Sequence, residues 1–277
     1  MGMLSINTNV GALKAADAAY SVNKSMETSM QRLSSGKRIN SAIDDAAGLQ
    51  ISQRMTAEIR GFTQAARNAA DAQSMLATME GAIAEQHNIL QRLREIGVQA
   101  ASDTNNAADR TALQSEADAL EAEKSRISDD TTWANNQLIH NDANSFTFHV
   151  GPDGSDTITK TIIDMAHDNA SGYNIAASNV VTTRATANTY IGVIETAINA
   201  AGTQRERIGA VMNRLDHTMA NLTNMATNLS LAKGRVEDAD FAAESANLAR
   251  TQVLQQASMS MLAQANASKQ NILALFQ

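Results

Sequence analysis

The chain has 277 residues, a formal net charge of −7, only 3 % aromatic residues, one proline and no cysteine. The lack of cysteine excludes disulfides, thiolate metal sites and cysteine nucleophiles, and the acidic balance argues against nucleic-acid binding, which needs clustered Lys and Arg. No apolar run reaches the ~20 residues needed to span a bilayer, so membrane insertion is not expected.

The N-terminal half predicts three helices in succession. A loose apolar stripe over about residues 4–34 ends at Gly36, which can take the left-handed conformation of a helix stop. Asn40 and Ser41 are candidate caps for a long second helix at about residues 44–101, in which early acids favour the N-terminus. A third helix is expected at about residues 107–129, after a break rich in capping residues.

The middle of the chain changes to a period of two. Aromatic and β-branched residues alternate with polar ones on both sides of a turn that contains Gly151, Pro152 and Gly154. This pattern predicts a β-hairpin at about residues 145–163. We expect mostly loop from residue 164 to residue 188.

The stretch from Thr189 to Gln277 carries apolar residues at alternating steps of three and four. This spacing keeps one stripe on one side of a helix and favours packing against partner helices. At ~1.5 Å per residue, one helix of this length would exceed ~100 Å, so it must lie against other long helices, from this chain or from copies of it. The predicted fold class is mainly α: a long antiparallel helical rod or coiled coil formed from both termini, with a small mid-chain β-hairpin region.

Several motifs near the two ends, in the same order, resemble those of bacterial flagellin. They stand at residues 6–9, 32–40, 44–51, 236–242, 264–266 and 272–276. The chain departs from the family at residues 133–136, where members often have Phe-Asn-Gly, and at residues 267–269, where they often have a proline. The resemblance implies a minimal flagellin that lacks the variable outer domains.

The resemblance also implies a division into two domains. Residues 1–43 and 235–277 would form a terminal coiled coil that lines the filament core and is disordered in the monomer. Residues 44–234 would form a helical rod that carries the hairpin. The family's function implies a structural subunit that is exported unfolded through the flagellar type III route and that polymerises through its terminal helices.

Apolar residues of the two ends are therefore the candidate self-assembly residues. They are Ile6, Val10, Leu13, Leu33, Leu248, Val253, Leu254, Leu262, Leu273 and Phe276. The implied partners are copies of the chain in a helical filament, an export chaperone, and the hook-associated junction and cap proteins. The implied location is the extracellular flagellar filament, and the N-terminus shows no pattern of a cleavable secretion signal.

A second candidate surface lies in the expected second and third helices. The stretch from Leu90 to Ile96 resembles the flagellin segment recognised by the vertebrate Toll-like receptor for flagellin. Arg92 and Glu116 match charged positions of that epitope, and Ile96 stands where leucine is usual. Contact between subunits is the main role expected for this segment, and receptor recognition is an open second one.

No pattern in the sequence indicates catalysis, a cofactor or a metal site. None of the five histidines belongs to a His-Glu-x-x-His motif, and no phosphate-binding glycine loop is present. We therefore do not expect an enzyme. Two alternatives stay open. A hook–filament junction protein would use the same terminal helices, whereas a cell-surface adhesin or polysaccharide-binding protein on a flagellin scaffold would use the hairpin and the third helix.

Overall fold

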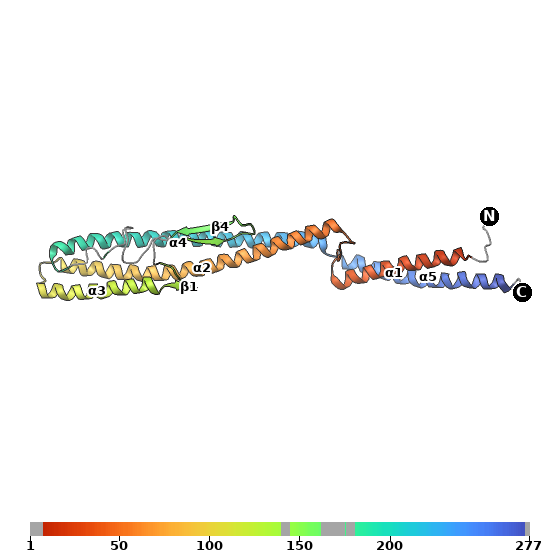
Figure 1. Ribbon diagram of the computed structural model, residues 1–277, viewed down its shortest axis with the longest axis horizontal. Coiled ribbons are helices and arrows are strands. Elements are labelled where there is room, and N and C mark those ends of the chain that lie inside the picture. The colour runs from red at the N-terminus through yellow and green to blue at the C-terminus, as the bar shows by residue number, and fades with distance from the viewer. Residues whose placement is uncertain (1–7, 140–144, 162–174, 176–180, 275–277) are drawn as a thin grey trace. The chain divides into compact units, whose positions relative to one another are not determined.

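The computed structural model describes residues 8–139, 145–161, 175 and 181–274, and it is mainly helical. The elements are α1 Val10–Ser35, α2 Ala46–Ala100, α3 Ala107–Asp130, β1 Thr132–Trp133, β2 Asn136–Gln137, β3 Ser145–His149, β4 Thr157–Thr161, α4 Arg184–Glu237 and α5 Phe241–Ala274 (Figure 1). The chain divides into a terminal unit, residues 1–57 and 228–277, and a central unit, residues 58–227. The expected fold class, mainly α with a small antiparallel β region, is confirmed.

The terminal unit is built on an antiparallel pair of helices, α1 and α5, which lie side by side (Figure 1). Asn9 caps α1 by accepting a hydrogen bond from the amide of Ala12 at 3.1 Å. Gly36 ends α1 with a φ of 70°, as the sequence predicts, and its amide donates to the carbonyl of Arg32 at 2.9 Å. The expected terminal domain, residues 1–43 and 235–277, lies within this unit.

The cap of α2 differs from the prediction. Asp45, not Asn40 or Ser41, caps the helix, because its carboxylate accepts the amide of Gly48 at 2.9 Å. The amides of Asn40 and Ser41 instead donate to the carboxylate of Asp44, at 3.1 and 2.9 Å. A turn closed on the carboxylate of Asp44 therefore precedes the helix, and α2 starts at Ala46.

The expected single C-terminal helix is wrong. It is divided into α4 and α5 at residues 238–240. Asp240 caps α5 by accepting hydrogen bonds from the amides of Ala242 and Ala243 at 2.9 and 3.2 Å. A stripe of apolar residues can continue across such a break, so periodicity alone does not reveal it.

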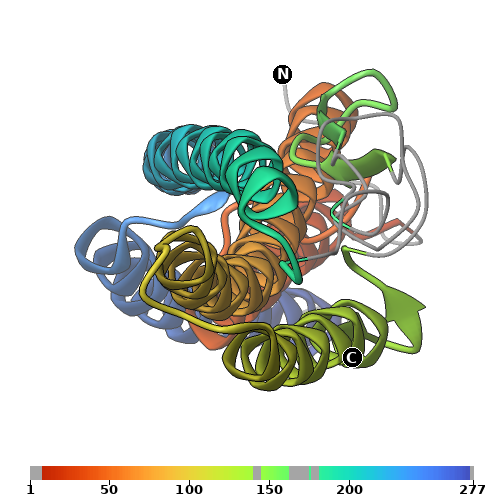
Figure 2. The same cartoon turned by 90° about the vertical axis from the view of Figure 1, so that its left-hand side faces the viewer.

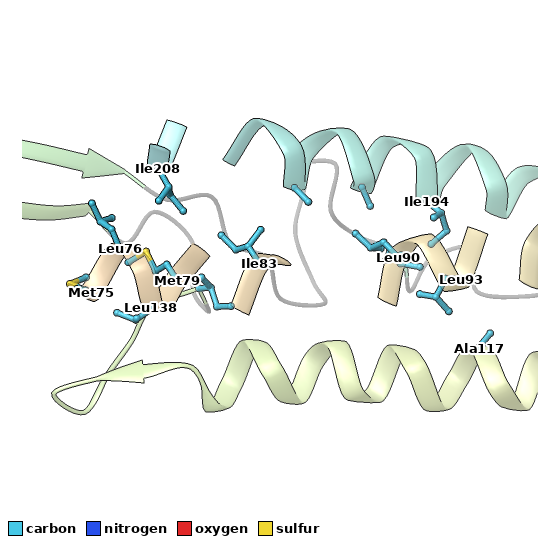
Figure 3. Packing of buried hydrophobic residues seen from close by; sticks show 14 of the residues in the cluster. Met75, Leu76, Met79, Ile83, Leu90, Leu93, Ala117, Leu138, Ile194 and Ile208 are labelled. Carbon is cyan, nitrogen blue, oxygen red and sulfur yellow. The ribbon is translucent and has the colours of Figure 1, made fainter. Parts of the chain in front are cut away.

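The core of the central unit lies where α2, α3 and α4 meet, and Figure 2 shows these three helices as neighbours. Leu90 and Leu93 of α2 point between Ile194 of α4 and Ala117 of α3 (Figure 3), and all four are fully buried. α2 and α4 run antiparallel: Arg205 pairs with Glu80 at 2.7 Å, and Gln73 donates to Asp216 at 2.5 Å.

The predicted hairpin is confirmed, with β3 and β4 antiparallel and Ser145 opposite Thr161. It rests on the helices through the buried side chain of Ile158 and through Asn68, which donates to the carbonyl of His149 at 3.1 Å. A second ribbon, β1 with β2, was not expected. Its turn places Ala134 and Asn135 at positive φ. Most of the loop predicted at residues 164–188 lies outside the described residues.

Candidate functional site: the paired terminal helices

The seam between α1 and α5 is made mainly of small and polar side chains. On α1, a heptad of half-buried or buried positions comprises Ala12, Ala15, Ala19, Val22, Met26, Ser29 and Leu33. On α5, the corresponding positions include Glu244, Leu248, Thr251, Gln255, Ser258, Leu262 and Ala265. Small side chains let two helices approach closely, but they bury little apolar area. The pair is therefore weakly held by its own hydrophobic contacts.

Polar contacts fix the alignment of the two helices. Asn9 donates to the carbonyl of Ala265 at 3.2 Å, and Gln255 donates to the side chain of Asn23 at 2.7 Å. At the far end of α1, Arg32 lies 3.8 Å from Glu244. Such contacts, which are partly buried, set the register of the two helices.

Many of the larger apolar side chains of the two helices are exposed, although Leu33, Leu248 and Leu262 lie in the seam. On these two helices, nine of them are between 45 and 74 % exposed: Val10, Leu13, Tyr20, Met30, Phe241, Val253, Leu254, Met259 and Met261. We call this set the outward face. Exposed apolar side chains gathered on one pair of helices indicate an interaction surface, because leaving them in water is unfavourable. The paired helices thus present an assembly surface that the chain itself does not cover.

The ten predicted assembly residues fall into three groups. Val10, Leu13, Val253 and Leu254 belong to the outward face, while Leu33, Leu248 and Leu262 are half-buried along the seam. Ile6 and Phe276 lie outside the described residues, as does the side chain of Leu273. Heptad spacing identifies apolar positions on both faces, and it does not separate one face from the other.

A compact hydrogen-bonded junction, which we call the clasp, joins residues 36–38 to residues 236–239. The amide of Arg38 donates to the carbonyl of Glu237 at 2.6 Å, and the amide of Ala239 donates to the carbonyl of Gly36 at 3.0 Å. The guanidinium of Arg38 adds a bond of 2.8 Å to the carbonyl of Val236. Two segments far apart in the sequence are therefore held together where α1 and α4 end.

Glu237 is the electrostatic centre of the clasp. Its side chain is 9 % exposed and forms ion pairs with Lys37 and, at 3.5 Å, with Lys233. Its other contact is a hydrogen bond of 2.5 Å from the hydroxyl of Ser52. Hydrogen bonds from Lys37 and Ser52 favour the ionised form and hold the pKa of this carboxyl below its usual value. Sequence analysis missed this site, because its members are separated by up to two hundred residues.

The second predicted surface is a charged group on the central unit. Arg92 donates two hydrogen bonds to Glu116, at 3.0 and 2.7 Å, and one to Glu95 at 2.9 Å. These contacts raise the pKa of Arg92. Arg92 and Glu116 are exposed, whereas Ile96 is fully buried in the core. Recognition of this group by a partner stays a prediction, and Arg92 and Glu116 are the members that a partner could touch.

The described residues contain no group of three or more His, Cys, Asp or Glu side chains placed to hold a metal ion. None of the described helices is long and apolar enough to cross a membrane. What the site presents is an apolar surface, a clasp and charged groups, and this combination defines a class: structural proteins that assemble through long helices.

Comparison with known proteins identifies the family. Residues 6–144 match the model of the bacterial flagellin N-terminal helical region, and residues 191–276 match that of the C-terminal helical region. The chain is 39 % identical to a flagellin of Halalkalibacterium halodurans, over 98 % of this chain and 99 % of the relative. It is 36 % identical to a flagellin of Bacillus subtilis, with the same coverage of both chains. A solved structure of a flagellar hook-associated protein from Vibrio parahaemolyticus shares the fold, with a TM-score of 0.61 at 14 % identity over 70 % of this chain and all of that one.

The protein belongs to the bacterial flagellin family, and it is a structural subunit of the flagellar filament. Relatives of nearly the same span support the expectation of a minimal flagellin. The junction protein and adhesin alternatives are not favoured, because the full-length relatives above are flagellins.

Proposed function

We propose that the outward face of α1 and α5 is the surface that becomes buried between neighbouring subunits in the filament. The observation that carries this proposal is the inverted distribution of side chains: the seam has mainly small and polar residues, while nine large apolar residues stay exposed. In a polymer, the partners that cover this face are other copies of the chain. Contacts between different surfaces of successive copies do not close on themselves and generate an open helical polymer.

The free-energy contributions favour terminal helices that become ordered when subunits assemble. At ~25 cal/mol per Å2, covering the outward face along two helices stabilises the assembled subunit strongly. The weak seam leaves the isolated pair with little to offset the loss of chain entropy. The terminal helices are therefore disordered in the monomer and fold when they meet neighbours, as binding-coupled segments do.

The same proposal covers export, partners and location. A subunit whose terminal helices fold only on assembly can pass through the flagellar type III channel in an unfolded state. An export chaperone covers these ends before export. The filament then lies outside the cell, between junction and cap proteins, and the subunit carries no catalytic activity. Arg92 and Glu116 serve contacts between subunits first, and they are the group that a flagellin-sensing Toll-like receptor would meet.

Deletion of either end tests the assembly proposal. We expect proteins that lack residues 1–34 or 247–277 to stay folded and soluble, because the core of the central unit is intact, but not to lengthen filament seeds. The point variant Leu13→Asp should have the same effect without shortening the chain. Val98→Asp is the matched control: it places an acid at an apolar residue of the central unit that is 56 % exposed, and it should still polymerise. Filaments formed by either truncated protein would refute the proposal.

A further inference from the structure

A polar hollow of about 290 Å3 interrupts the pairing of α1 with α5. The guanidinium groups of Arg32 and Arg250 line it together with one carboxylate, that of Glu244. The amide of Asn247 and four hydroxyl groups complete the lining, the hydroxyls from Ser25, Thr28, Ser29 and Thr251. A hollow lined by charged and polar side chains is a place where a specific polar group fits.

The charges in the hollow do not balance. Arg32 lies 3.8 Å from Glu244 through one terminal nitrogen, and its Nε atom is buried with no hydrogen-bond partner among the described residues. Arg250 donates one long bond of 3.3 Å to the side chain of Asn247. Two cations thus line the hollow with one carboxylate. After hydrogen bonds from backbone amides, the charge of Arg32 also helps to lower the pKa of Asp44, which lies outside the lining, but the buried Nε–H of Arg32 remains unused. A buried donor without an acceptor is unfavourable, so the hollow is suited to one more carboxylate.

An acid that lacks a partner lies on the outward face of the same helix. Leu13, Tyr20 and Glu27 follow one another at steps of seven, and all three side chains are exposed. No ion pair joins Glu27 to another side chain in the described part of the chain, including Lys24 one turn away. When a neighbouring subunit covers Leu13 and Tyr20, Glu27 is carried into the same contact. Burying a carboxylate there is costly unless it meets a cation.

We infer that Glu27 of one subunit occupies the hollow between Arg32 and Arg250 of the next subunit in the filament. This inference rests on the proposed assembly through the outward face, and it adds the ion pair that fixes the register of that contact. The acid and its receiving hollow are different surfaces of one chain. Each subunit therefore offers both, and the contact repeats along a head-to-tail polymer.

A charge exchange tests the pairing. The readout is the critical concentration for growth from sonicated filament seeds, measured by pelleting, for Glu27→Arg, Arg250→Glu and the double variant. We expect each single variant to raise the critical concentration by at least about tenfold, because it leaves like charges in one contact. The double variant restores opposite charges and should return to within about threefold of the unmodified protein. Circular dichroism of each monomer checks that the helices of the central unit are retained.

Asp17 supplies the matched control, since it is an exposed acid on the same helix. The combination of Asp17→Arg with Arg250→Glu should not restore assembly, and rescue by it would overturn the assignment to Glu27. Single variants that assemble as well as the unmodified protein would also overturn the pairing. If the charge reversals unfold the monomer, the coupling measured in a cycle of Glu27→Gln and Arg250→Gln decides instead, and additive effects would refute the pair. Failure of the unmodified protein to lengthen seeds would instead refute the proposed assembly itself.

Discussion

Glu237 is the residue whose side chain contributes most contacts to the clasp. It is the most buried acid of the described terminal unit, at 7 % exposed, and it is satisfied by Lys37, Ser52 and Lys233. An acid in this position is favourable only because each of these groups is present, since an unpaired buried carboxylate would be destabilising. The clasp therefore depends on Glu237 more than on its backbone hydrogen bonds.

Replacing the acid tests this dependence. We expect Glu237→Gln to lower the free energy of unfolding by about 1 kcal/mol, because the hydrogen bonds with Lys37 and Ser52 lose their charged acceptor. The effect is no larger because solvent screens the half-exposed Lys37. The measurement is the urea midpoint of helix loss by circular dichroism. Glu195→Gln, on the exposed side of the same helix α4, should leave the midpoint unchanged.

The effect of this variant depends on pH in a defined direction. Because the folded-state pKa of Glu237 lies below its usual 4.5, its contribution is fully present above that value and is lost as the pH falls through the folded-state pKa. The difference in urea midpoint between the unmodified protein and Glu237→Gln should therefore be constant near neutral pH and close in acid. A difference that is independent of pH would contradict the proposed role of the charge.

At the scale of the element, α4 buries one polar side chain on the apolar face that packs into the core. Gln204 is 1 % exposed, and neither atom of its amide group has a hydrogen-bond partner among the described residues. Its neighbours on the same face, Ala201 and Ile208, are fully buried and apolar. An amide desolvated in this way costs about 1–3 kcal/mol.

We therefore expect Gln204→Met to stabilise the central unit by about 1 kcal/mol, because methionine keeps the length of the side chain and removes the unsatisfied amide. Gln86→Met is the matched control on α2. Gln86 is also fully buried, but it donates to the carbonyl of Lys124 at 3.2 Å, so its loss should lower stability. Urea unfolding measures both, and a loss of stability in Gln204→Met would show that the amide is satisfied by bound water.

The elements that were predicted correctly are those with local causes. The ends of α2 and α3 lie within two residues of the expected positions, and the hairpin occupies its expected turn, because periodicity and turn residues act over a few positions. The division between α4 and α5 was missed because the apolar stripe continues across it, although its cap, Asp240, is local. The clasp beside it joins Gly36 and Arg38 to residues 236–239 across about two hundred positions of sequence.

The candidate site was predictable only in outline for the same reason. Heptad spacing identified Leu13 and Leu33 as apolar positions of one helix, but only the packing shows that Leu13 is exposed and Leu33 half-buried. Ile96 was grouped with Arg92 because the stretch that contains both resembles a receptor-recognised flagellin segment, and the three-helix core buries Ile96. Which face a residue occupies is set by the neighbouring helix, and that neighbour is distant in the sequence.

At the scale of the whole molecule, apolar burial is distributed unevenly between the two units. Of the described apolar residues that are buried, only Ala19 and Ile39 belong to the terminal unit, and the rest belong to the central unit. Because burial of apolar surface is the dominant stabilising contribution, the two units differ in intrinsic stability. The chain therefore combines a self-sufficient unit with one whose stability comes from other copies.

This difference predicts how backbone amides exchange with deuterated solvent. In the isolated subunit, amides of α1 and α5 should exchange rapidly, because local opening there exposes little buried apolar surface, while core amides of α2 and α4 in the central unit stay protected. In filaments the outward face is covered, and exchange in α1 and α5 should slow by at least about a hundredfold, as binding stabilises the folded state. Hydrogen exchange read out by mass spectrometry compares the two forms of one preparation, with the central core as the internal control. Equal protection of α1 and α5 in both forms would mean that the terminal pair is stable by itself, and assembly would then need another source of free energy.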